Sequence, residues 1–187
     1  KDKKAFESNR NLLVIDQVDK SENIEAAIIE EWVKVLFGET AHINGAQHPW
    51  MVQGIAHFYK THYLRTYYPN KLFIGPIGKS TLGKFFDADE YPDAYRDIFL
   101  YQYMARQGLD QPLSDSAAAF PRFNYEAIVQ SKAALNLEYL HTYCGTLAFR
   151  RSMQRFLEKQ KNNETNGTPL DFINAFKFYV FTDLNWF

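Results

Sequence analysis

Apolar residues recur at intervals of three and four through most of the chain, a spacing that indicates amphipathic helices. Proline and glycine separate these stretches, as they do where helices begin and end. The pattern predicts helices over residues 21–38, 50–67, 92–107, 124–143 and 146–161, and a last one ending near residue 179. The expected fold class is therefore mostly α, with six helices and little strand.

Three of these helices carry specific end signals. Pro49 precedes the second helix, where its fixed φ suits a first turn. Gly145 separates the fourth helix from the fifth. Thr168 and Asp171 have the spacing of a capping box, which predicts that the last helix begins beside them.

The first predicted helix carries many large apolar side chains, which suits a helix packed against other elements. We therefore expect it to be largely buried. The apolar side chains that lead to this expectation are Ile24, Ile28, Ile29, Trp32, Val35 and Leu36.

The remaining segments read as connections within a single domain that covers residues 1–187. Residues 1–20 are predicted to form an extended lead-in segment, because a polar start is followed by a short β-branched apolar run at 11–18. Residues 69–91 contain five glycines and prolines, which is too many for one long element.

Composition narrows the classes of protein that this chain can belong to. Hydrophobic residues make up 46% and charged residues 23%, which is the composition of a globular chain and not that of a disordered one. The formal net charge of -1 lacks the basic excess of a nucleic-acid binder. No apolar run approaches the roughly 20 residues of a membrane span, and nothing indicates a compartment.

Aromatic residues are unusually frequent, with 16 Phe, 12 Tyr and 3 Trp. Large aromatic side chains bury much apolar surface, so we expect most of them to fill the core. A glycan-binding surface built from stacked aromatic rings is the alternative interpretation of the same composition.

Several short motifs resemble chemical sites but lack a required residue. The string GPIGKST at 75–81 has Phe73 where a phosphate-binding loop needs glycine. His57 and His62 are five residues apart, which separates them by about 140° around a helix and excludes a shared zinc. Cys144 is a single cysteine near a helix end, and we expect it to pack rather than to react.

The segment AAIIEEWVKVLFGE at 26–39 resembles the zinc-binding helix of the aminopeptidase N and leukotriene hydrolase family of gluzincin metallopeptidases. Its Phe-Gly pair matches the end of that helix, which places Glu30, Glu31 and Lys34 on the family's His-Glu-x-x-His motif. The family's third ligand follows the second histidine by nineteen positions, and Gln53 stands there. The neighbouring Trp, Gly and Ala coincide with the family without a gap.

Further segments extend the resemblance towards the end of the chain. The run IVQSKAALNLEYL is similar to the family's Tyr-x-Lys-Gly-Ala segment, with Gln130 at the position of the catalytic tyrosine. The runs TPLDFINAF and DLNWF resemble two later family segments. The resemblance implies a multi-helix, thermolysin-like peptidase fold, truncated because the family continues beyond this point.

The departures from the family pattern argue against zinc chemistry. Zinc needs three protein donors and a water that it can acidify. Lys34 brings a cation instead of a lone pair, Gln53 is a poor neutral ligand, and Glu31 alone keeps its residue type. We therefore expect no zinc, no other cofactor or metal, and no working catalytic residue in this set.

The expected function is that of a catalytically inactive metallopeptidase-like domain that serves as a scaffold or binds a peptide or protein. One alternative is an active hydrolase with an atypical site. Such a site would use an unusual metal arrangement, or Glu31 as general base, or acid–base chemistry shared by Glu30 and Glu31. Another reads Glu30 and Lys34 as an ordinary surface ion pair. The resemblance also predicts that the helices carrying Lys34 and Gln53 pack antiparallel. Glu30 and Lys34 should then both point toward Gln53, with Lys34 paired to a carboxylate.

Overall fold

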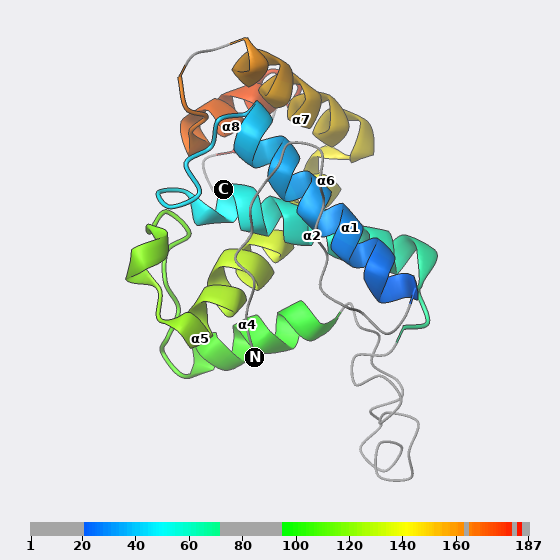
Figure 1. The fold of residues 1–187 in the computed structure, drawn as a ribbon, viewed down its shortest axis with the longest axis vertical. Helices are drawn as coiled ribbons and strands as arrows, with labels where there is room; N and C mark the ends of the chain where they lie inside the picture. Colours follow the sequence, from blue (N-terminus) through cyan, green and yellow to red (C-terminus); the bar gives the residue numbers. More distant parts are fainter. Residues whose placement is uncertain (1–20, 72–94, 163–164, 181–182, 185–187) are drawn as a thin grey trace, which may run out of the picture.

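The computed structural model describes residues 21–71, 95–162, 165–180 and 183–184. All regular elements in these ranges are helical, so the mostly α prediction is confirmed (Figure 1). Their order is α1 (Ser21–Val35), η1 (Leu36–Thr40), η2 (Trp50–Gly54), α2 (Ile55–Tyr67), α4 (Arg96–Arg106), η5 (Ala117–Ala119), α5 (Arg122–Tyr125), η6 (Glu126–Lys132), α6 (Ala133–Cys144), α7 (Thr146–Lys161) and α8 (Pro169–Lys177).

Helices α1 and α2 pack against each other in antiparallel directions. Lys60 contacts Glu30, whereas Tyr63, farther along α2, contacts Glu25, which comes earlier on α1. The two helices therefore run in opposite directions. In Figure 1, α7 and α8 lie above this pair, and α4 and α5 lie below it. The predicted antiparallel packing of the two helices is confirmed.

The core is filled mainly by phenylalanine side chains contributed by helices from both halves of the chain. Phe37 stacks on Phe156, and Phe156 meets Phe172 edge to face. Phe58 and Phe149 continue the cluster with ring centroids 5.3 Å apart. All five side chains are buried. No tyrosine in the described ranges is buried, so the core interpretation is confirmed for these phenylalanines and is wrong for most of the described aromatic residues.

Gly54 allows the start of α2 to lie directly against η6 and α6. A Cβ atom on Gly54 would stand 2.4 Å from the Cβ of Ala133 and 2.8 Å from the carbonyl oxygen of Val129. Neither distance leaves room for a methyl group. The close approach of these helices therefore depends on glycine at this position.

The predicted helix ends are largely confirmed. The Thr168 side chain accepts from the backbone N–H of Asp171, and the Asp171 carboxylate accepts from the Thr168 N–H, which completes the capping box. Gly145 lies between α6 and α7 with a φ of 79°. Gly38 does not end the first helix, because π-helical backbone continues through it to Thr40.

The prediction that the first helix is largely buried is wrong. Its core-facing side is formed by Ala26, Val33 and Phe37, while a row of apolar side chains on the opposite side remains exposed. We call this row the α1 stripe. The exposed fractions of its members are Ile24 40%, Ile28 41%, Trp32 62% and Val35 41%.

Two predicted features, the lead-in segment 1–20 and the GPIGKST string at 75–81, lie outside the described residues. The predicted connection at 69–91 lies mostly outside them as well. Within the described ranges, no helix has the length and apolar character needed to cross a membrane.

Candidate functional site

Two lysines and two glutamates alternate along the surface where α1 packs on α2. The Lys34 Nζ lies 2.7 Å from Glu31 Oε1 and 3.6 Å from Glu30 Oε1. The other carboxylate oxygen of Glu30 accepts from the Lys60 Nζ at 2.7 Å. We call these four residues the lysine–glutamate cluster. The predicted pairing of Lys34 with a carboxylate is confirmed.

The cluster holds Glu30 in its charged form. Burial alone would raise the pKa of Glu30, but the charge and hydrogen bond of Lys60 and the charges of Lys34 and His57 outweigh burial and lower it. Burial raises the pKa of Tyr125, while the charge of Lys34 opposes this effect. Lys34 therefore also influences a tyrosine from α5, which the sequence reasoning missed.

These residues do not fit a zinc ion. Both oxygens of Glu30 already face ammonium groups, and Lys34 supplies positive charge where a ligand must supply a lone pair. The carboxylate of Glu31 accepts from the same lysine, so it is engaged in an ion pair. The charges of the two lysines and the two glutamates balance one another without a metal ion.

The two glutamines of the family comparison lie on neighbouring elements, Gln53 on η2 and Gln130 on η6, which pack together. Both side chains are partly buried. Within the described part of the chain, neither side chain forms a hydrogen bond with the lysine–glutamate cluster. A direct approach of Lys34 to Gln53 stays a prediction.

A second polar group lies buried where α2, α4 and η6 meet. The Asp97 Oδ1 accepts from the Ser131 hydroxyl at 2.7 Å and lies 2.8 Å from the His57 Nε2. We call these three residues the inner histidine cluster. Serine and histidine both contact the carboxylate and not each other, so the histidine cannot activate the serine as a nucleophile.

The inner histidine cluster keeps a carboxylate ionised inside the protein. Burial would raise the pKa of Asp97, but the hydrogen bond and charge of His57 and the Ser131 hydroxyl, with the charge of Lys60, lower it. The His57 Nδ1 is buried and has no hydrogen-bond partner among the described residues. These contacts tie three helical elements together, which is a structural role.

A third group, half exposed, lies between α2 and α6. His62 comes from α2, and Glu138 and His141 come from α6. One ligand atom from each lies within 4.8 Å of the other two, and the His62 Nδ1 is 3.9 Å from Glu138 Oε2. We call these residues the outer histidine cluster. The sequence reasoning missed it because the two histidines are far apart in the chain.

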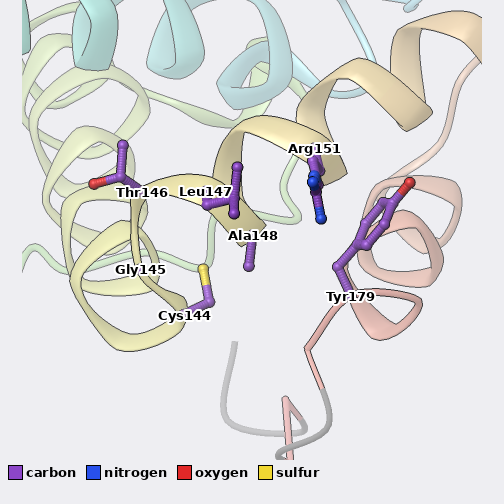
Figure 2. A pocket seen from close by; sticks show the side chains of 7 residues that line it. All are labelled: Cys144, Gly145, Thr146, Leu147, Ala148, Arg151 and Tyr179. Carbon is purple, nitrogen blue, oxygen red and sulfur yellow. The ribbon is translucent and has the colours of Figure 1, made fainter.

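A pocket of about 390 Å³ lies at the junction of α6 and α7. Figure 2 shows Cys144 on one side of it and Arg151 and Tyr179 on the other. The Cys144 thiol donates to the Leu140 carbonyl oxygen at 2.8 Å. Burial raises the pKa of this thiol, which disfavours the reactive thiolate. The pocket shares no residue with the three polar clusters.

Comparisons with protein-family models, with curated proteins and with solved structures found no match to this chain. The resemblance to gluzincin peptidases therefore depends on the sequence segments alone, in which Phe37, Gly38, Trp50, Gly54 and Ala56 match the family and Glu31 is the one motif position that keeps its residue type.

Proposed function

We propose that this chain is a catalytically inactive, metallopeptidase-like helical domain that binds a polypeptide partner through the α1 stripe. The observation that carries the proposal is the exposure of four apolar side chains on the side of α1 opposite the core. A helix that is apolar on both sides normally has neighbours on both sides. The core covers one side of α1, and the proposed partner covers the other.

The spacing of the α1 stripe suits a single binding surface. Ile24, Ile28 and Trp32 are four residues apart, and all four members fall within about 80° of one another around the helix. Large aromatic side chains often supply most of the affinity at a protein interface. Trp32, at 62% exposed, is therefore the proposed anchor.

Charge indicates what kind of segment would bind. The lysine–glutamate cluster borders the α1 stripe, since Glu31 and Lys34 share the helix with it. Its two positive and two negative groups balance internally, so it leaves little net charge to attract a strongly charged ligand. The proposed partner is an amphipathic helix or another apolar peptide segment, bound along the stripe.

Loss of catalysis follows from the same cluster. A hydrolase of the resembled family needs a metal-bound water, and Lys34 stands at a ligand position with its ammonium against Glu31. Glu31 as a general base would have no activated water to serve. We therefore expect no turnover of chromogenic amino-acid amides, and activity that disappears in Glu31→Gln would favour the hydrolase alternative.

The binding role can be tested by selecting, from a random peptide library, the peptides that bind the whole chain. Selected peptides should be apolar, and their affinity should fall at least tenfold in Trp32→Ser. Tyr103→Ser is the matched control, because Tyr103 is also 62% exposed but lies on α4. Peptides that bind Trp32→Ser and the unaltered chain equally well would contradict the proposal.

A further inference from the structure

The outer histidine cluster brings three metal-ligating side chains together from distant parts of the chain. Glu138 and His141 are three residues apart on α6, so they share one face of that helix. Helix α2 packs against α6 and places His62 opposite them. Neither helix alone carries a complete ligand set, which explains why no local motif reveals it.

The distances within the cluster are close to those of a metal site. Bonds of about 2.0–2.1 Å in a tetrahedral zinc site place neighbouring ligand atoms about 3.3 Å apart. In the structure, the His62 Nδ1 and Glu138 Oε2 are 3.9 Å apart, and the three ligand atoms lie within 4.8 Å of one another. Small rotations of partly exposed side chains would close the remaining gap.

Neighbouring residues already orient the ligands. The Arg65 Nη1 lies 3.1 Å from Glu138 Oε1, which leaves Oε2 facing His62. The His62 ring stacks on Phe58 with centroids 5.8 Å apart, and the His141 ring meets Phe149 edge to face at 5.0 Å. Hydrogen-bonding partners such as Arg65 commonly hold ligating carboxylates in place.

The donor chemistry differs from that of the lysine–glutamate cluster. Two imidazoles and one carboxylate form the set that zinc uses when it keeps an open coordination position. No lysine ammonium stands among these ligands, although the guanidinium of Arg65 beside Glu138 will weaken cation binding. We propose that His62, Glu138 and His141 bind one Zn²⁺ between α2 and α6.

The bound zinc would fasten α2 to α6 at the protein surface. The His62 side chain is 45% exposed and that of Glu138 is 28% exposed, so solvent can reach the remaining coordination position. This site lies apart from Glu30, Lys34 and Gln53. We therefore still expect no zinc at the positions that align with the family's ligands. We revise that expectation only for the outer histidine cluster.

Zinc titration of the whole, chelator-treated chain tests the proposal, with metal content and melting temperature as readouts. One Zn²⁺ should bind per chain and raise the melting temperature, because a ligand that binds only the folded state stabilises it. The double variant His62→Gln/His141→Gln should lose at least tenfold in affinity. His42→Asn is the matched control, since His42 is exposed and asparagine tolerates its positive φ of 50°.

The unaltered chain provides a second readout that does not depend on the variants folding. In spectra of ¹⁵N-labelled imidazoles, zinc should shift the signals of His62 and His141 and leave that of His57 unchanged. Substoichiometric binding at saturating zinc, equal affinity in the double variant, or shifts confined to other histidines would each overturn the proposal.

Discussion

Helix α2 carries two histidines that are five residues apart and lie in contrasting surroundings. His57 points into the interior, where Asp97 and Ser131 complete the inner histidine cluster. His62 lies at the surface beside Glu138 and His141 of the outer histidine cluster. About 140° of helical rotation separates the two positions.

The difference shows how burial and partners decide what a histidine can do. The inner imidazole and the Ser131 hydroxyl each contribute one hydrogen bond to the buried Asp97 carboxylate, so removing any member leaves an unpaired polar group in the core. The outer imidazoles face solvent, and Glu138 Oε2 remains 3.9 Å from its nearest histidine nitrogen. One cluster is structural, and the other has lone pairs left for a ligand.

The largest expected effect comes from removing the charge at the centre of the inner histidine cluster. Asp97→Ala should lower the free energy of unfolding by about 3–5 kcal/mol, because it breaks a buried charged network. Chemical denaturation measures the loss. Glu126→Ala is the control, since its ion pair with Arg96 is about half exposed and should contribute no more than about 1 kcal/mol. Equal losses in both variants would contradict the structural role.

The inner histidine cluster also depends on the close packing of α2 against η6, which Gly54 permits. Gly54→Ala should destabilise the protein by about 1–3 kcal/mol, as overpacking does. Gly38→Ala is a matched control, because nothing lies within 4 Å of the added Cβ there. Alanine is the better helix former, so this control should be neutral or stabilising. A stabilised Gly54→Ala protein would show that the helices do not approach this closely.

A matched pair of histidine substitutions compares the two clusters directly. His57→Gln should cost about 1.5–3 kcal/mol, because it removes a hydrogen bond to a buried charge. His62→Gln should change the free energy of unfolding by about 0.5 kcal/mol or less in metal-free buffer. Thermal unfolding of both variants without metal provides the test. A reversed order would mean that the two histidines have exchanged roles.

The smallest expected effect is a change in acid sensitivity. The folded protein lowers the pKa of Asp97, so the unfolded chain binds a proton at this residue before the folded chain does. Its stabilising contribution is complete above the unfolded pKa of about 3.9 and is lost as pH falls through the lower folded value. Asp97→Asn should therefore lose less stability than the unaltered chain between about pH 5 and pH 2 in denaturation experiments. Parallel acid profiles would contradict the assigned pKa direction.

The sequence predicted the local features of the fold well. Helices 50–67 and 146–161 have the predicted bounds, and the capping box at Thr168 is present. Gly38 led to a wrong predicted end for the first helix, because a glycine with an ordinary helical backbone can remain inside a helix. The apolar residues of the α1 stripe led to the wrong prediction that the first helix is largely buried. Apolar spacing does not reveal which side of a helix the rest of the chain covers.

The candidate sites could be predicted only in part. The pairing of Lys34 with Glu30 and Glu31 follows from helical spacing, so the sequence revealed it. The contacts of Asp97 with His57 and of His141 with His62 join residues on different helices. Such contacts depend on how the helices cross, which no local pattern encodes.

Anomalous diffraction at the zinc absorption edge, from crystals of the whole chain grown with zinc, tests the contrast between the two histidine clusters most directly. The proposed site predicts one strong peak within bonding distance, about 2.0–2.2 Å, of a ligand atom from each of His62, Glu138 and His141. It predicts no peak beside His57 and none between Glu30 and Gln53. A peak at either of those places, or none at the outer histidine cluster, would contradict the assignment of the metal to the surface of α2.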